Sequence, residues 1–200
     1  NEAGIASFML ICPLGRIAIQ LPVPGLHNVS NALAAAAVTT SLGLSLEQVK
    51  SGLMTMVPVK GRFCVQKLSD SVTVIDDTYN ASVQSVMAAI DTLSVMPGHR
   101  VLVFGDMGEL GADAATLHRQ IGEHAKAKKL DTVLTIGELS RNTAEAASGQ
   151  HFVNKESLYQ ALQQLMQQQR PVTILAKGAR SARMEDVVAF VKSCEEKTAC

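Results

Sequence analysis

The sequence lacks the features that define several large classes of protein. None of its apolar runs approaches the roughly 18 residues that a membrane-spanning helix requires. Its 18 basic and 18 acidic side chains give a formal net charge of zero, which argues against binding bulk nucleic acid through a basic face. Its four cysteines form no CxxC pair. They are typical of reduced thiols in a cytosolic protein and not of a zinc site or a disulfide framework.

A phosphate loop is also absent, because no Gly-Lys pair followed by serine or threonine occurs in the sequence. The chain therefore has no evident cradle for a triphosphate, and by itself it cannot be a complete enzyme of the phosphate-loop kind. It begins at Asn1 without a methionine and shows no signal-peptide pattern. We expect it to be part of a longer protein.

What is present is a chain with enough apolar residues to fold. Hydrophobic residues make up 47% of the 200, and the mean hydropathy of +0.17 argues against disorder. The length suits one domain or two small ones. The best boundary candidate is VPVKGR, residues 57–62, because the pattern of predicted elements becomes regular only after it.

Before this boundary the sequence predicts two strands followed by two helices. LPVPG, residues 21–25, is expected to end regular strand structure, and Asn28 is a good helix N-cap. Gly43 is expected to end the first helix, and Ser45 to cap the second. The predicted strands span 8–11 and 16–21, and the second helix ends at about 53.

After the boundary, strands alternate with helices. This alternation predicts an α/β fold, a mostly parallel sheet with helices on both faces, in which ligands bind beyond the carboxyl ends of the strands. Helices are predicted from about residue 83, in the segment after the strand at 101–104, and over 141–147, 155–168 and 184–197. The predicted strands span 72–75, 101–104, 133–136, 151–153 and 172–176.

Polar residues follow the ends of three of these strands. The segments are DDTYN at 76–80, GDMGELG at 105–111 and KGARS at 177–181. In a parallel sheet they lie at one edge, so together they can line one cleft.

The second and third segments offer opposite charges. Lys177 and Arg180 before a helix can bind a carboxylate or phosphate, although a solvated loop with Ser181 as helix cap explains them equally well. Asp106 and Glu109 can hold an ammonium group or a metal-bound water, although a glycine-rich turn with capping carboxylates is the favoured alternative.

Asp76 and Asp77 repel each other unless a cation, a metal or a hydroxyl donor lies nearby. Asp77 can accept hydrogen bonds from a ribose and Tyr79 can stack on a flat group, while an Asx-turn is the alternative. His118 can point back towards the cleft, but a packing role is favoured for a lone helical histidine.

Asn28 and Asn31 lie three residues apart, on one face of the first predicted helix. Paired amides of this kind can bind the edge of a purine, and capping explains Asn28 equally well.

Five segments, in this order and spacing, resemble the Mur ligases of bacterial cell-wall synthesis. They are LPVPGLHNVSNALAAAA, VKGRF, DDTYNAS, GDMGELG and KGARS. The resemblance runs from about Gly4 to the C-terminus. DDTYNA and GDMGELG are similar to the family member that joins D-alanyl-D-alanine to UDP-N-acetylmuramoyl-tripeptide. Folylpolyglutamate synthase shares only the general plan.

The resemblance implies two parts of a larger cytoplasmic enzyme. Residues 1–60 match the C-terminal part of a phosphate-loop ATP-binding central domain, and residues 61–200 match a Rossmann-like C-terminal domain. The implied reaction is ATP- and Mg²⁺-dependent amide formation through an acyl phosphate, with the N-terminal and central domains of the same chain as partners. No nucleic acid or membrane insertion is implied. We expect this chain alone to be inactive because the phosphate loop is absent.

The resemblance also implies site residues. Asn28 and Asn31 match asparagines near the adenine, Arg62 matches an arginine that reaches the phosphates on closure, and Asp77 matches an aspartate at the ribose. The remaining members of this nucleotide set are Tyr79 and Asn80.

Charge matching gives the candidate residues for the ammonium and carboxylate ends of the dipeptide D-alanyl-D-alanine. No catalytic residue and no metal ligand is assigned in this chain. The family often has Asn-Pro where this sequence has Ser82-Val83, and serine where it has Ala179. The dipeptide candidates are Asp106, Glu109, Lys177, Arg180 and Ser181.

Other interpretations remain open at this point. The chain can be an isolated Rossmann-like module that binds a ligand without catalysis, or part of a ligase like folylpolyglutamate synthase. A NAD-dependent oxidoreductase would need a glycine fingerprint after the first strand of the sheet, and the sequence has none.

Overall fold

The computed structural model describes residues 5–57 and 59–198, and the chain divides into two compact units, Asn1–Pro58 and Val59–Cys200. Each unit has its own hydrophobic core.

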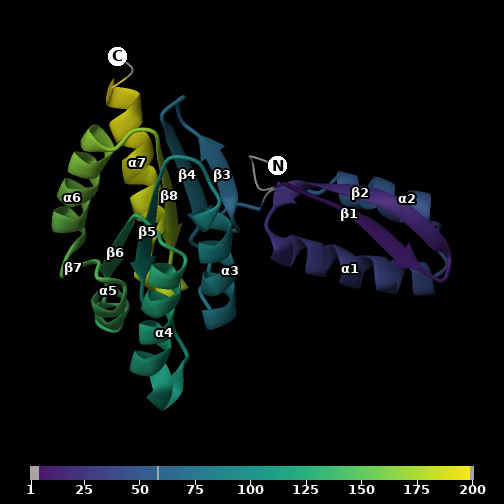
Figure 1. Cartoon of the computed structure of the whole chain (residues 1–200), viewed down its shortest axis with the longest axis horizontal. Helices are drawn as coiled ribbons and strands as arrows, with labels where there is room; N and C mark the ends of the chain where they lie inside the picture. The colour runs from purple at the N-terminus through teal and green to yellow at the C-terminus, as the bar shows by residue number, and fades with distance from the viewer. Residues whose placement is uncertain (1–4, 58, 199–200) are drawn as a thin grey trace. The chain divides into compact units, whose positions relative to one another are not determined.

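The first unit is a β-hairpin with two helices. Strands β1 (Ile5–Cys12) and β2 (Gly15–Pro24) pair antiparallel, and helices α1 (Leu26–Ser41) and α2 (Leu46–Met54) follow (Figure 1). The predicted Ser45 cap is confirmed, because Ser45 and Gln48 form a reciprocal capping box. The core of this unit consists mainly of Leu10, Ile19, Leu21, Val23, Ala32, Ala36, Leu46, Val49 and Leu53.

Two local predictions for this unit are wrong. The 21–25 segment does not end the strand, since β2 continues to Pro24. In a two-stranded hairpin both strands are edges, and prolines are tolerated where no ladder N–H is needed. Asn28 is not the N-cap of α1: the cap is Gly25, with φ of 97°, and Asn28 is the third helical residue. Asn28 does share a helix face with Asn31, whose Nδ2 lies 3.5 Å from Asn28 Oδ1.

The second unit is built on a six-stranded sheet with the order β3-β4-β8-β5-β6-β7. The predicted mostly parallel sheet is confirmed, with only β3 antiparallel. The β3 strand was not predicted from the sequence. The strands are β3 (Cys64–Lys67), β4 (Val72–Asp77), β5 (His99–Gly105), β6 (Thr132–Ile136), β7 (Gln150–Phe152) and β8 (Val172–Lys177).

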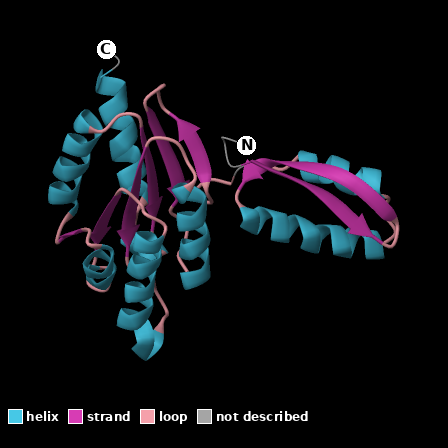
Figure 2. Ribbon diagram, in the orientation of Figure 1, coloured by secondary structure: helices cyan, strands magenta, loops and turns pink. Residues whose placement is uncertain are grey.

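Helices cover both faces of this sheet (Figure 2). Helices α3 (Val83–Ser94) and α4 (Ala114–Ala127) pack in one core cluster, and α6 (Lys155–Gln168) and α7 (Glu185–Thr198) in the other. A short helix, α5 (Arg141–Ala147), follows β6.

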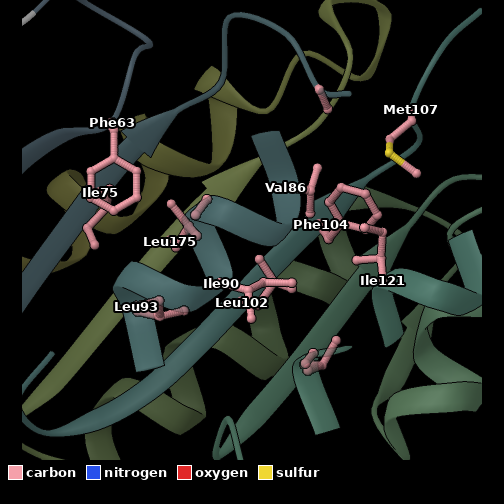
Figure 3. Close-up of a cluster of buried hydrophobic side chains, with 14 of the residues drawn as sticks. Phe63, Ile75, Val86, Ile90, Leu93, Leu102, Phe104, Met107, Ile121 and Leu175 are labelled. Atoms are coloured by element: carbon pink, nitrogen blue, oxygen red, sulfur yellow. The ribbon is translucent and has the colours of Figure 1, made fainter. Parts of the chain in front are cut away.

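Alternate residues along the central strands supply the two cores. Ile75, Leu102 and Leu175 belong to the cluster under α3 and α4, which Figure 3 shows, whereas their neighbours Val74 and Ile174 belong to the cluster under α6 and α7. Successive side chains of a strand point to opposite faces of a sheet, so strands covered on both faces are apolar throughout. This burial makes the middle of the sheet a rigid platform for the residues at its ends.

None of the helices in residues 5–57 and 59–198 is both long and apolar enough to cross a membrane.

Gly122 allows helices α4 and α5 to approach closely. A Cβ atom at Gly122 would overlap the carbonyl oxygen of Thr143 and lie 2.7 Å from the Cβ of Ala146. We therefore expect Gly122→Ala to force the helices apart and to lower the free energy of unfolding by about 1–3 kcal/mol. Urea titration followed by tyrosine fluorescence measures this directly, because both tyrosines, Tyr79 and Tyr159, belong to the second unit.

Gln120→Ala in α4 is the matched control. Gln120 is exposed on the same helix, and alanine is the better helix former. The tyrosine transition of this variant should not shift to lower urea, and equal destabilisation by both variants would contradict the packing explanation for Gly122.

Candidate functional site

The ends of three parallel strands meet at one edge of the sheet, as the sequence predicted. Strands β4 and β8 are in register at Asp77 and Lys177, and β5 and β8 at Phe104 and Lys177, so the three strands end at one level. Segments after all three line a cavity of about 640 Å³. Its lining residues are Tyr79, Asn80, Ala81, Ser82, Gly108, Glu109, Leu110, Ala179, Arg180 and Ser181.

A buried ion pair lies beside this cavity. Lys177 is 2% exposed, and its Nζ lies 2.6 Å from Asp77 Oδ2 and 3.0 Å from the carbonyl oxygen of Asn80. The other carboxylate oxygen of Asp77 accepts the backbone N–H of Phe63 at 3.0 Å. Lys177 is thus the cation that the paired aspartates require, and its ammonium group is engaged within the chain.

Asp76 has a different role from Asp77. It is buried, and its Oδ1 accepts the Thr78 hydroxyl at 2.6 Å and the Thr78 N–H at 3.4 Å. This is the Asx-type turn that the sequence offered as an alternative. It turns the chain out of β4 and presents Tyr79, which is 51% exposed.

Arg62 stacks on Tyr79. The guanidinium carbon lies 4.3 Å from the ring centroid, within the range of a cation–π contact. The backbone is fastened at the same place, since Tyr79 N–H donates to Gly61 O at 3.0 Å. One face of the Tyr79 ring is therefore covered by a cation from the segment before β3.

The side chain of Asp106 holds the start of α5. Its carboxylate accepts the backbone N–H groups of Glu138, Leu139 and Ser140 at 2.7–3.2 Å. A carboxylate at the N-terminus of a helix satisfies free N–H groups and interacts favourably with the helix dipole. The capping alternative thus describes Asp106, whereas Glu109, with φ of 59°, lines the cavity.

His118 is fully buried and does not line the cavity. Its Nε2 lies 3.0 Å from the N of Met107, and its Nδ1 lies 2.8 Å from Ala114 O. The favoured packing role is confirmed, and the histidine is joined to the backbone of the 105–111 segment.

The KGARS segment contacts β5 closely. Cβ atoms at Gly105 or Gly178 would lie 2.8 Å from atoms of the Met184 side chain, and Ala179 N–H donates to Asp106 O at 2.7 Å. Arg180 Nη1 lies 3.1 Å from Glu185 Oε1.

Ser181 does not cap α7. It lies in a 3₁₀ turn, Arg180–Ala182, and Arg183, with φ of 48°, separates that turn from the helix at Glu185. Helix α7 begins at Glu185, one residue after its predicted start at 184.

The predicted site residues of the second unit thus fall into two groups. Tyr79, Asn80, Glu109, Arg180 and Ser181 line the cavity, and of these Arg180 also pairs with Glu185. The charged groups of Arg62, Asp77, Asp106 and Lys177 contact other parts of the chain. Other lining residues were not predicted, although their position next to the strand ends could have indicated them: Ala81, Ser82, Gly108, Leu110 and Ala179.

The second unit matches a known protein family. The model described as "Mur ligase, glutamate ligase domain" matches residues 61–180, a span that includes all three strand ends. The chain belongs to the Mur ligase family.

Relatives with known names agree with this assignment. The chain is 44% identical over 194 residues to the UDP-N-acetylmuramoyl-tripeptide–D-alanyl-D-alanine ligase of Escherichia coli (strain K12), covering 96% of this chain and 42% of that protein. It is thus similar to less than half of that ligase.

Two solved structures have the same fold. MurF from Acinetobacter baumannii superposes with a TM-score of 0.90 at 34% identity, over 96% of this chain and 43% of that one. MurF ligase from Thermotoga maritima in complex with ADP gives a TM-score of 0.82 at 25% identity, over 99% of this chain and 45% of that one.

The buried ion pair makes a stability prediction. Lys177→Met leaves the half-buried Asp77 carboxylate, whose side chain is 14% exposed, without its cation, and we expect it to lower the free energy of unfolding by up to about 3–5 kcal/mol. Adding Asp77→Asn to this variant removes the unpaired charge and should recover part of the loss. Urea titration followed by tyrosine fluorescence measures both.

Lys67→Met is the control, because the ion pair of Lys67 with Asp70 is solvent-exposed. Its unfolding midpoint should match that of the parent. A midpoint for Lys177→Met as high as that of Lys67→Met would show that the buried pair does not contribute to stability.

Proposed function

We propose that this chain is the part of an ATP-dependent cytoplasmic ligase that binds D-alanyl-D-alanine, which the enzyme adds to UDP-N-acetylmuramoyl-tripeptide in peptidoglycan synthesis. The observation that carries the proposal is the cavity at the ends of β4, β5 and β8, with Glu109 and Arg180 in its wall. The name of the E. coli relative, at 44% identity, supports the substrates.

The charges in the wall suit the two ends of a dipeptide. D-alanyl-D-alanine carries an ammonium group and a carboxylate, and Glu109 and Arg180 offer the opposite charges. We assign the carboxylate to Arg180 and Ser181, because a guanidinium fork and a hydroxyl both donate to such a group. The volume of about 640 Å³ lies within the usual range for small-molecule sites.

Three of the predicted site residues position other parts of the chain. Lys177 fixes Asn80 through its carbonyl oxygen, Asp77 fixes Phe63, and Asp106 fixes the start of α5. In this proposal they shape the cavity wall, and Glu109, Arg180 and Ser181 contact the dipeptide. Asp77 also remains our candidate for the ribose.

For the nucleotide we propose the other residues of the set. Arg62 is exposed and carries the cation for the phosphates, next to Tyr79 and Asn80. In the first unit, Asn28 and Asn31 present amides on one helix face for the adenine. We assign Mg²⁺ to no residue of this chain. Residues 5–57 and 59–198 contain no group of three His, Cys, Asp or Glu side chains suited to a metal.

The proposed reaction proceeds in two steps. The terminal carboxylate of the tripeptide attacks the γ-phosphorus of ATP, giving an acyl phosphate and ADP. The dipeptide amine, once it has lost a proton, attacks the acyl carbon, and phosphate leaves as the amide forms. The contribution of this chain is to hold the amine in position, a task that can supply much of the rate enhancement. Without a phosphate loop, we expect the chain alone to be inactive.

A chimaera tests the proposal. This chain should replace the matching 42% of the E. coli ligase, and phosphate release should be measured with UDP-N-acetylmuramoyl-tripeptide, ATP and D-alanyl-D-alanine. We expect release only when all three substrates are present, and none from this chain by itself. A folded chimaera that binds the dipeptide in calorimetry but releases no phosphate would favour a binding module without catalysis.

Arg180 provides a sharper test of the site. We expect Arg180→Gln in the chimaera to raise KM for D-alanyl-D-alanine by about 10- to 100-fold, the equivalent of one lost charged hydrogen bond. The KM for ATP should not change. The control is Arg183→Gln, directly after this turn but outside the cavity wall. Equal effects of both substitutions on the dipeptide KM would remove Arg180 from the site.

A further inference from the structure

The segment that carries Glu109 is fastened to helix α4 by a single buried histidine. His118 has no exposed surface, and both nitrogens of its ring have backbone partners. Met107, whose N lies 3.0 Å from His118 Nε2, precedes Glu109 by two residues. The ring of His118 also lies near that of Phe104 at the end of β5, with 5.9 Å between the ring centroids.

The partners of His118 determine its protonation. The Met107 N–H can only donate, so Nε2 must accept and carries no proton. Nδ1 therefore carries the proton and donates it to Ala114 O at 2.8 Å. Both nitrogens of the neutral ring are used within the chain, so His118 is not available to exchange protons with a substrate.

Asp106, the Met107 side chain and Leu110, which packs against the same core cluster as Met107, also fasten this segment. Asp106 accepts N–H groups of the 138–140 segment, and its carbonyl oxygen accepts the N–H of Ala179. The Met107 side chain is 2% exposed and belongs to the core cluster shown in Figure 3. Beyond Met107 the chain turns through the positive φ of Glu109. The hydrogen bond from Met107 to His118 thus lies directly before Gly108, where the segment begins to line the cavity.

We propose that His118 is a positioning residue of the acceptor site. Through Met107 it fixes Gly108, Glu109 and Leu110 in the cavity wall and thereby sets the affinity for the ammonium group of the acceptor. The inference rests on the proposed function, because it assigns that group to Glu109. It adds His118, which does not contact the substrate, to the residues that determine the affinity for the acceptor.

Two substitutions separate the two hydrogen bonds of His118. In His118→Asn the side-chain amide ends near the position of Nδ1, so it can keep the bond to Ala114 O but cannot reach Met107. In His118→Gln the amide extends to about the position of Nε2, and its oxygen can accept the Met107 N–H. Only the asparagine variant should release the segment.

The measurement is steady-state kinetics of the chimaera. We expect His118→Asn to raise KM for D-alanyl-D-alanine about tenfold and to leave KM for ATP unchanged, while His118→Gln stays within about threefold of the parent. The control is His124→Asn on the same helix, whose side chain pairs with Asp91 at the surface. In the 200-residue chain, amide exchange at Met107 should become faster in His118→Asn and not in His118→Gln.

The outcomes are distinguishable. A folded parent chimaera that neither releases phosphate nor binds D-alanyl-D-alanine in calorimetry would overturn the proposed function and this inference with it. An active parent, together with an unchanged dipeptide KM in His118→Asn, would overturn this inference alone. Equal losses in the asparagine and glutamine variants would also overturn it, since they would indicate a general packing role.

Discussion

The arrangement of the site depends on the buried ion pair between Lys177 and Asp77. Burying two charges is costly, and it is tolerated only when their remaining hydrogen-bonding capacity is satisfied. Here Lys177 also contacts the carbonyl oxygen of Asn80, and Asp77 accepts the N–H of Phe63. The pair therefore holds together β8, the turn after β4 and the residue before β3. These contacts fix the strand ends next to the cavity.

Much of the second unit could be predicted from the sequence, because its strands are covered on both faces. Val101–Phe104 is apolar throughout and Val72–Ile75 is interrupted only by Thr73, and each is followed by an amphipathic helix. The β3 strand escaped prediction because Cys64–Lys67 is half-buried and shows neither alternation nor an apolar run. In the first unit, the prolines after Leu21 suggested a break, although an edge strand accommodates them.

The site was predictable in outline but not in its contacts. The polar segments after three strands were predicted to lie at one edge of the sheet, because the carboxyl ends of parallel strands meet there. The partner of Lys177 depends on the placement of β8 beside β4, strands that lie about a hundred residues apart in the chain. Local sequence carries no information on that neighbour. From the sequence, Lys177 was therefore predicted to bind a ligand, whereas the structure pairs its charge with Asp77.

The cavity wall is made of three separate segments, each anchored at its base to a different strand of the platform. The anchoring groups, Asp106, His118 and Lys177, point into the protein, while the residues that face the cavity lie further along the three segments. Mutation can therefore exchange the contact residues of one segment without disturbing the others. In evolutionary terms, such a cavity is modular: relatives on the same scaffold can diverge in the residues that line it while they keep one folding core.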